Sequence, residues 1–474
     1  MKKILSVCVC LGLLIVSVTA VSGILSNKES AIKYRAFIQQ DADFDVLFFG
    51  TSHMHNAIDP MMLWKDFGIV SYNMANEGCR IATIYWQIRL ALDYTTPKLI
   101  VVDCAYLNRE EKTKNKDGAV HKVLDIFPLS KTKKEAVFDL YDDKDHRERM
   151  LFPFSAYHNR WNELTEQDFK PDYNKAKGFD YSYAVCPVRL PELQFEKKVE
   201  VKSVGVEYLN RIRDLCKEKG IELLLTYLPY EYSEKSADDG VFVYHFAKEN
   251  NIPCLNGNEL REIVNEETDF INGLEDNSHL NWSGAQKVTA YIGQYIRDHY
   301  ESVADRRNDK EYKKWKSDYR QYRAEKWRTI RKQTKPEEIL VSAFDRELDF
   351  MIELDGRDIL TIEPYSQLFE NIGVNIQDPG DRMIIIRREG EINYLTEDEA
   401  LHTGLIKYTA GTPSERVLVF DETEIKINSL LENEENQIQV ILSEAETHQK
   451  VYGEVFCYQV KEISPHMQIE ITEV

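Results

Sequence analysis

The sequence centres on Val46-Leu47-Phe48-Phe49-Gly50-Thr51-Ser52-His53, in which four apolar residues stop abruptly at a glycine and two hydroxyl side chains. A short continuous apolar run of this kind predicts a strand buried on both faces, as in a parallel sheet. Similar runs recur up to residue 300, and amphipathic helical patterns separate them. This alternation predicts an α/β fold with a doubly wound parallel sheet covered by helices on both faces.

The predicted elements of this sheet are short strands and longer helices. Strands are expected over 46–49, 70–74, 99–104, 221–228 and 252–255, and helices near 81–94, 201–219, 241–250 and 283–300. Residues 107–200 interrupt the alternation with a polar and aromatic insertion that has little strand pattern. Such an insertion beside the end of a sheet could form a lid or substrate wall, or it could be a simple helical excursion.

Length and charge set limits on the whole chain. With 474 residues, of which 43% are apolar, the chain is long enough for two to four domains with real cores. Its 60 basic and 80 acidic residues give a net charge of -20, which argues against binding of nucleic acid. We expect four parts: a signal-anchor or signal peptide over 1–26, an α/β domain that contains the insertion over 27–300, a basic aromatic helical linker over 301–335, and a β-rich domain over 336–474.

The N-terminus has the pattern of a membrane-targeting segment. Lys2 and Lys3 precede residues 4–25, which carry no charge and are long enough to span a bilayer. Val18-Thr19-Ala20 resembles a small-residue cleavage site, so a cleaved leader and a secreted protein remain an alternative to a membrane anchor. In both cases the positive flank predicts that the chain after about residue 26 lies outside the cytoplasm, in the cell envelope.

Residues 301–335 form a basic segment on an acidic protein, with 13 Lys or Arg against 6 Asp or Glu. Tyr312, Trp315, Tyr319 and Tyr322 follow one another at steps of three and four residues, which places them on one face of a helix. This face could dock onto a neighbouring domain. Alternatively, it could offer an aromatic and cationic surface to an anionic glycan or to the membrane.

From residue 337 onward the pattern becomes mostly β, with apolar runs at 350–354, 383–387, 416–420 and 437–443. Through Val417-Leu418-Val419-Phe420-Asp421 and the run from Ile438 through Leu442 to Phe456, this part is similar to the interleukin-like domain of some secreted cytokine-like and glycan-processing proteins. The resemblance implies a compact β-rich module for glycan or protein contact. A structural appendage is the alternative.

Two groups of residues could carry chemistry. Ser52 follows the first predicted strand, at the carboxyl edge where open α/β sheets bind ligands, and could supply both a nucleophile and its own backbone N–H as an oxyanion donor. Much later, Asp276-Asn277-Ser278-His279 precedes the last predicted helix of the sheet domain. The spacing of Asp276 and His279 lets the carboxylate hold the imidazole while its other nitrogen takes a proton from the serine.

With these motifs, residues 45–300 resemble the SGNH (GDSL-like) hydrolase superfamily, and most closely its membrane-anchored extracytoplasmic branch. That branch includes the D-alanyl lipoteichoic acid transfer protein and polysaccharide O-acetylation proteins. The resemblance implies that Ser52 is the nucleophile, His279 the general base and Asp276 the residue that orients it. It also implies that Gly78, after the second strand, supplies an oxyanion N–H alongside that of Ser52.

One block of the family pattern is missing. Where the superfamily has Gly-x-Asn after the third strand, this chain has Asp103-Cys104-Ala105-Tyr106-Leu107-Asn108. Asn76, Tyr106 or Asn108 could replace that donor or line the substrate pocket. The departure puts catalytic competence, but not the fold, in question.

Histidines beside Ser52 raise the question of a metal. His53 and His55 form a His-x-His pair, but no carboxylate cluster with ligand spacing accompanies them, so we expect no metal and interpret His53 as a pocket-lining side chain. The sequence contains no phosphate-binding loop of the Gly-x-x-x-x-Gly-Lys type. We therefore expect no cofactor.

Two functions remain open at this point. The first is acyl-ester chemistry outside the membrane, with O-acyl or acetyl transfer to, or removal from, a cell-surface polysaccharide. By analogy with anchored relatives, an acylated donor would then come from a membrane-embedded partner. The second is a catalytically weak or inactive module that keeps the fold and binds envelope glycan or assembles with a membrane partner. The missing third block favours the second function.

Overall fold

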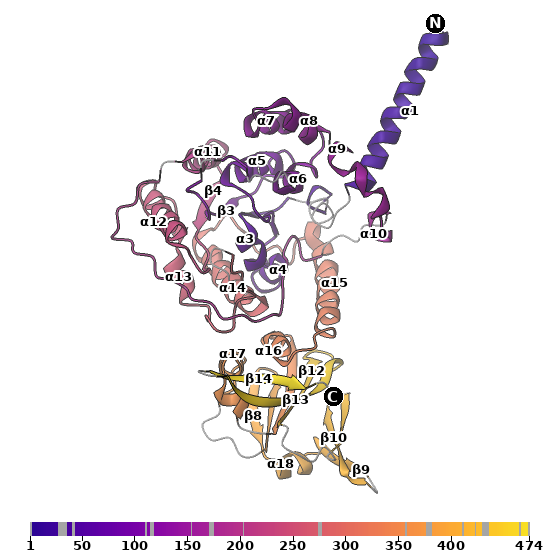
Figure 1. Ribbon diagram of the computed structural model, residues 1–474, viewed down its shortest axis with the longest axis vertical. Helices are drawn as coiled ribbons and strands as arrows, with labels where there is room; N and C mark the ends of the chain where they lie inside the picture. Colours follow the sequence, from indigo (N-terminus) through magenta and orange to yellow (C-terminus); the bar gives the residue numbers. More distant parts are fainter. Residues whose placement is uncertain are drawn as a thin grey trace.

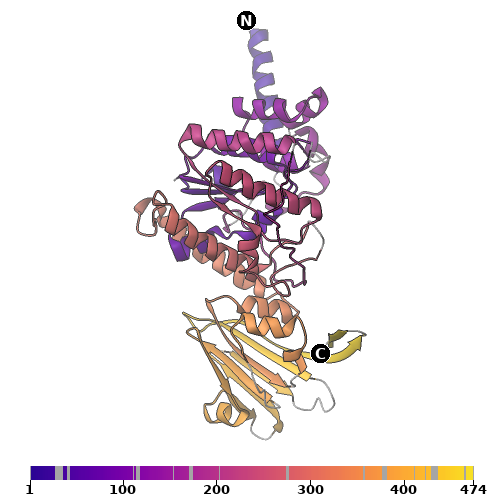
Figure 2. The same cartoon turned by 90° about the vertical axis from the view of Figure 1, so that its left-hand side faces the viewer.

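The computed structural model describes residues 2–26, 36–39, 43–109, 111–113, 118–152, 154–169, 175–201, 203–273, 277–355, 358–375, 382–409, 412–421, 423–428, 436–463 and 466–472. A long N-terminal helix, α1 (Lys2–Leu25), projects from an α/β body, and a β-rich body lies at the opposite end of the molecule (Figures 1 and 2). Residues Ile4–Leu25 of α1 are long and apolar enough to cross a membrane. The most apolar 18-residue stretch of this helix is not buried by the rest of the protein.

The α/β body is built on a five-stranded parallel sheet. Its strands are β1 (Val46–Phe49), β2 (Ser71–Asn73), β3 (Leu99–Asp103), β4 (Glu222–Thr226) and β5 (Cys254–Leu255). They lie in the order β2-β1-β3-β4-β5, and each pair is parallel. The predicted fold class is therefore confirmed. Strand β2 lies on one side of β1, and the later strands β3, β4 and β5 lie on the other side. The strand order therefore reverses between β1 and β3, and such a switch point opens a crevice at the carboxyl ends of the strands.

Helices cover both faces of the sheet, as its continuous apolar strands require. The helices of this body are α3 (Ser52–Ala57), α4 (Pro60–Phe67), α5 (Ile81–Ala91), α11 (Val204–Lys219), α12 (Glu234–Glu249), α13 (Gly257–Arg261) and α14 (Trp282–His299). Leu47 and Phe49 pack in one apolar cluster with α5 and α11, whereas Val46 and Phe48 pack in a second cluster with α14. Alternate residues of β1 thus face opposite layers.

The described residues of the insertion form short helices up to residue 169 and then turns and irregular chain from 175 onward, with no strand. The insertion contains α6 (Gly118–Leu124), α7 (Lys131–Leu140), α8 (Lys144–Leu151), α9 (Phe154–Tyr157), the 3-10 helix η1 (His158–Asn162) and α10 (Glu166–Phe169). It also borders the switch-point edge, because Lys122 Nζ on α6 lies 2.6 Å from Glu77 Oε2 in the turn after β2. Its last part returns to the same edge, where Asp180 N donates to the His55 carbonyl.

The basic segment docks onto the α/β body through its aromatic face. It forms η2 (Lys310–Tyr312) and α15 (Lys313–Ile330). Tyr312, Trp315 and Tyr322 are buried, the Trp315 ring packs against Trp64 at 5.4 Å, and the Tyr322 hydroxyl donates to Asp59 Oδ2 at 2.9 Å. The docking interpretation is therefore the correct one, and the alternative of an exposed aromatic surface for glycan or membrane is wrong.

The β-rich body carries antiparallel sheets and short helices. Its elements are α16 (Pro336–Ala343), β6 (Leu348–Asp355), η3 (Asp358–Thr361), α17 (Tyr365–Asn371), β7 (Arg382–Arg388), β8 (Glu391–Leu395), α18 (Glu397–His402), β9 (Ile406–Thr409), β10 (Thr412–Phe420), β11 (Thr423–Asn428), β12 (Asn436–Glu444), β13 (Lys450–Ile463) and β14 (His466–Thr472). One sheet has the order β14-β13-β12-β6-β7-β8 and the other β11-β10-β9. The expected separate β-rich part is confirmed, but the short helices α16, α17 and α18 were not predicted.

Candidate active site at the switch point

The turn after β1 sets the position of Ser52. Thr51 is the N-cap of α3 and its side chain accepts from His53 N at 3.3 Å, so Ser52 becomes the first residue of the helix. A backbone N–H in the first turn of a helix has no acceptor within that helix, so the Ser52 N–H stands at a position suited to bind an anion. At Gly50 an added Cβ would lie 2.7 Å from Met54 Cβ and 2.9 Å from Asp103 Cβ. Only glycine therefore allows this turn to pack so closely against β3.

The fold brings His279 to Ser52 although 227 residues separate them. The distance between Ser52 Oγ and His279 Nε2 is 2.7 Å, which is a hydrogen bond. The loop before α14 is fixed on both sides of the histidine, because Ile271 N donates to the His279 carbonyl and the Asn281 side chain caps α14 by accepting from Gly284 N. The Asn281 amide also donates to the carbonyls of residues 184 and 268, which ties the loop to the body.

A residue that the sequence analysis missed faces the other side of the imidazole. Asn272 Oδ1 accepts from His279 N at 3.1 Å and lies 3.4 Å from His279 Nδ1. An asparagine seven residues before the histidine belongs to no motif, so no pattern in the sequence points to it. Asp276 lies outside the described residues, and its role as the orienting carboxylate stays a prediction.

The electrostatics keep His279 neutral near neutral pH. Burial lowers the pKa of His279 below its usual value of 6.5, and it outweighs Glu77 and a hydrogen bond with the Asn277 backbone, which act in the opposite direction. A neutral imidazole whose Nε2 contacts a serine hydroxyl can accept the serine proton. The pair therefore has both the geometry and the protonation state of a nucleophile and its base.

His53 lines the same edge through ring stacking. Its imidazole stacks on Tyr230, with ring centroids 4.0 Å apart and planes 10° from parallel, and lies 5.1 Å from the His279 ring. Tyr106 also approaches His53, at 5.7 Å between centroids. Tyr230 was not predicted, and only its place just after β4 could have indicated it. Within the described ranges, no three His, Cys, Asp or Glu side chains are grouped so that they could hold a metal ion.

The candidate donors differ in where they lie. Asn76 N donates to the Gly50 carbonyl at 3.2 Å, which places Asn76 against the turn that carries Ser52. Its side-chain Nδ2 is buried and has no hydrogen-bond partner among the residues that the structure describes. Gly78 occupies the turn after β2 at φ +67°, a left-handed conformation that favours glycine. In contrast, Asn108 gives its backbone N–H to Asp239 Oδ1 on α12, at 2.9 Å.

Tyr106 and Asp103 mark strain and buried charge at the end of β3. Tyr106 has φ +62°, and a non-glycine residue held in this region stores strain of order 1–3 kcal/mol. Burial raises the pKa of Asp103 to about 7, against the lowering effect of hydrogen bonds that include Leu228 N. Such a carboxyl changes charge within the range of pH in which most proteins work. Neither feature is visible in the sequence pattern.

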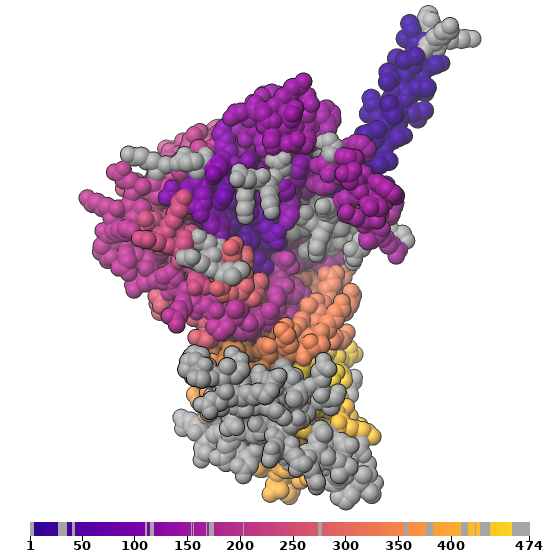
Figure 3. Space-filling model, viewed as in Figure 1, coloured from indigo at the N-terminus to yellow at the C-terminus, as the bar shows by residue number. Residues whose placement is uncertain are grey.

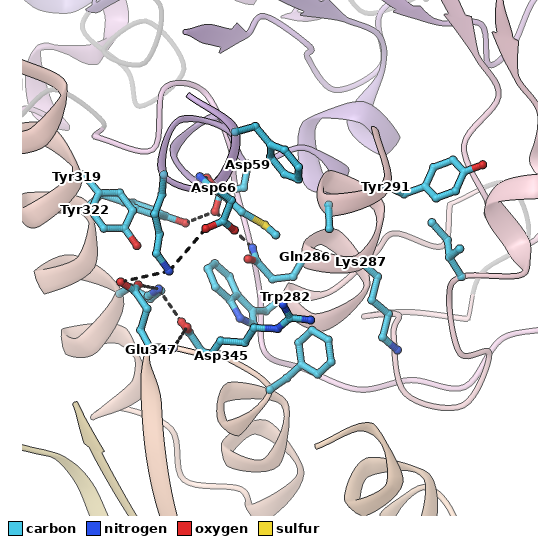
Figure 4. A pocket seen from close by; sticks show the side chains of 18 residues that line it. Asp59, Asp66, Trp282, Gln286, Lys287, Tyr291, Tyr319, Tyr322, Asp345 and Glu347 are labelled. Atoms are coloured by element: carbon cyan, nitrogen blue, oxygen red, sulfur yellow. Dashed lines mark hydrogen bonds and ion pairs between the residues drawn. The ribbon is translucent and has the colours of Figure 1, made fainter. Parts of the chain in front are cut away.

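A large cavity lies away from the Ser–His pair, at the junction between the two bodies (Figure 4). Its volume is about 680 Å³, and it is lined by α4, α14, α15 and residues 344–347. Tyr322 and Gln286 point to Asp59 on one wall, and Lys326 pairs with Asp345 and Glu347 on another. The cavity contains neither member of the Ser–His pair, and its charged groups are largely paired with each other. It is a feature of how the bodies join.

Comparisons with known proteins add little at this point. No protein-family model matches the chain, and no curated protein matches it in sequence. Several solved structures match it in part, and two of them are from Bacteroides species. A candidate acylhydrolase from Bacteroides fragilis is 12% identical, with 58% of this chain and 97% of that chain covered and a TM-score of 0.28. A GDSL-like lipase from Bacteroides thetaiotaomicron is 14% identical, with 57% and 99% covered and a TM-score of 0.27. Scores this low carry no argument about activity.

The first prediction concerns the close packing at Gly50. The variant Gly50→Ala should displace the turn and slow the reaction of Ser52 with a fluorophosphonate by about 100-fold, because small misplacements of reacting groups have large effects on rate. The rate can be followed by mass spectrometry of the intact protein. The control is Gly118→Ala, where an added Cβ meets nothing within 4 Å and the rate should not change. Equal rates for both variants would contradict the packing argument.

The second prediction concerns pH. Because the pKa of His279 is lowered, labelling of Ser52 should stay level through neutral pH and decline only as the pH falls below 6.5. Glu77→Gln removes a charge that raises this pKa, so the acid limb should move to lower pH. Glu218→Gln on α11 is the control and should leave the limb in place. If the labelling rate instead fell near pH 7 and Glu77→Gln did not shift this decline, the titrating group would be Asp103 and not His279.

Proposed function

We propose that this protein is an extracytoplasmic, serine-dependent acyl-ester enzyme of the SGNH (GDSL-like) type. One observation carries the proposal: Ser52 Oγ lies 2.7 Å from His279 Nε2 at the carboxyl edge of a parallel sheet, beside the switch point between β1 and β3. This edge is where open α/β sheets bind their ligands. A serine, a neutral histidine and a backbone N–H in the first turn of a helix, all in that place, suit acyl transfer.

In the proposed reaction, His279 Nε2 takes the proton of Ser52 as Oγ bonds to the acyl carbonyl carbon. The carbonyl oxygen then carries a negative charge until the C–O bond to the leaving alcohol breaks, and the alcohol departs with the proton from His279. An acyl group remains on Ser52. A sugar hydroxyl or water attacks this ester, gives its proton to His279, and releases Ser52 as that proton returns to Oγ. The reaction requires no cofactor.

The negative charge on the carbonyl oxygen needs donors, and we assign three. The N–H of Ser52 and the N–H of Gly78 correspond to the two donors expected from the family resemblance. The third is Asn76 Nδ2, which replaces the missing Gly-x-Asn donor. Its support is that this buried N–H group has no partner among the described residues and belongs to a residue bonded to the Gly50 carbonyl. An unpaired buried donor is costly unless a ligand pairs with it.

The proposed substrate follows from topology and from the resemblance. The apolar helix α1 is long enough to anchor the body to a membrane, which suits acyl groups that arrive from a membrane-embedded partner. We therefore propose O-acyl transfer, with acetyl as the simplest group, to a hydroxyl of a cell-surface polysaccharide, or removal of such a group. The body would act on the extracytoplasmic side.

Covalent labelling tests the reaction. Full-length protein in detergent should form a fluorophosphonate adduct at Ser52. Ser52→Ala should form none at this position, and His279→Ala should react more slowly by about 10³-fold or more, because serine and base act as a unit. Ser317→Ala on α15 and His299→Ala at the end of α14 are matched controls at exposed positions and should label like the wild type. A folded wild type that never labels would instead support a binding module.

The third donor has its own test. Asn76→Ala should lower the rate of acyl-ester hydrolysis by about 10²–10³-fold, the usual effect of removing one oxyanion donor. Asn108→Ala is the matched control, because the backbone N–H of Asn108 donates to Asp239 on α12 and this bond is retained in the variant. Rates for p-nitrophenyl acetate measure both effects. A larger loss for Asn108→Ala than for Asn76→Ala would show that the donor was assigned to the wrong asparagine.

A further inference from the structure

Exposed aromatic side chains gather on one part of the insertion. Outside α1, nine large apolar side chains of the described residues are exposed, and four of them lie within residues 152–169. These are Phe152, Phe154, Trp161 and Phe169, with 62%, 38%, 73% and 59% of their surface exposed. Isolated exposed apolar residues are normal, but a group this dense on one short segment marks an interaction surface. We call residues 152–169 the aromatic face.

The aromatic face is attached to the end of α1. Helices α9 and α10 and η1 all contact α1, and Figures 1 and 2 show this group of helices at the base of α1. The Arg160 guanidinium donates to the carbonyl of Leu25, the last residue of α1, and also to Asp168 Oδ1 at 3.1 Å. Asp168 in turn accepts from Thr165 N at 2.9 Å. These bonds hold the aromatic face at the level of Leu25.

That level has a physical meaning if α1 crosses a bilayer. Residues Ile4–Leu25 match the thickness of the hydrocarbon core, so Leu25 would lie where hydrocarbon meets headgroups. Figure 3 shows most of α1 projecting free of the body, with the insertion lying against its base. Trp is enriched at this depth in membrane proteins because its ring is apolar with a polar edge, and Phe rings on interfacial segments are buried at the same boundary.

We propose that the aromatic face is a second membrane contact, in which Phe152, Phe154, Trp161 and Phe169 enter the headgroup region of the leaflet that α1 leaves. The occupant is lipid, and the attraction is apolar. Residues 152–169 contain three carboxylates and a single arginine, so negative lipids gain nothing from them. The contact should therefore form on zwitterionic phosphatidylcholine. It does not depend on the chemistry proposed for Ser52.

The tryptophans of the chain allow a direct test. Trp64, Trp86, Trp282, Trp315 and Trp327 are all buried, and Trp161 alone among the six is exposed. We would reconstitute the full-length protein in phosphatidylcholine vesicles that contain brominated acyl chains. Bromine should quench part of the tryptophan emission, more strongly when it lies near the headgroup end of the acyl chain than near the terminal methyl. Trp161→Phe should abolish this quenching.

A matched control moves the exposed tryptophan to another place. In Trp161→Phe combined with Tyr408→Trp, the new indole stands on β9 of the β-rich body, at a position that is 48% exposed. It should not be quenched. Since α1 anchors every variant, weak vesicle binding cannot explain a negative result. Equal quenching of wild type and Trp161→Phe would overturn the proposal, whatever the outcome at Ser52, and would leave a protein partner as the occupant of the face.

Discussion

The close packing of β1 against β3 at Gly50 is the contact on which the site depends. The sheet is buried on both faces, so polar side chains can gather only where its strands end. At that edge, the turn at Gly50 lies so close to Asp103 that an added Cβ would be only 2.9 Å from Asp103 Cβ. Thr51 then caps α3, and Ser52 follows with its hydroxyl directed to His279. The hydrogen bond of the Ser–His pair is thus a consequence of backbone packing.

The end of β3 has its own arrangement at the place where an SGNH-type pattern would have Gly-x-Asn. Asp103 occupies this position and accepts from Leu228 N, which ties the end of β3 to the chain that leaves β4. The following residue with special geometry is Tyr106, held at positive φ. The asparagine that follows, Asn108, has its backbone N–H bonded to Asp239 on α12. The third oxyanion donor that we propose, Asn76, lies instead in the neighbouring turn after β2, where its backbone N–H is bonded to the Gly50 carbonyl.

The sequence predicted the sheet well because its signal is local. Continuous apolar runs mark buried strands, and β1 begins and ends as expected. Helix α12 starts at Glu234, earlier than predicted, because its first turns are polar and Ser233 caps them, so apolar periodicity begins only at Val241. The meeting of Ser52 and His279 was predictable from their positions at strand and helix ends. Asn272 and Tyr230 were not, since their roles depend on loop geometry and ring stacking that leave no periodic trace.

The two proposed membrane contacts, at α1 and at the aromatic face, would together constrain the site. A body held by a single helix can turn about the helix axis and tilt at its end. A second contact at the aromatic face would remove most of this freedom. The same insertion reaches the rim of the site, where Lys122 pairs with Glu77. Because the insertion contacts both the membrane and this edge, it would fix how the edge that holds Ser52 faces the lipid. An acyl donor presented at the membrane surface would then meet that edge in one orientation.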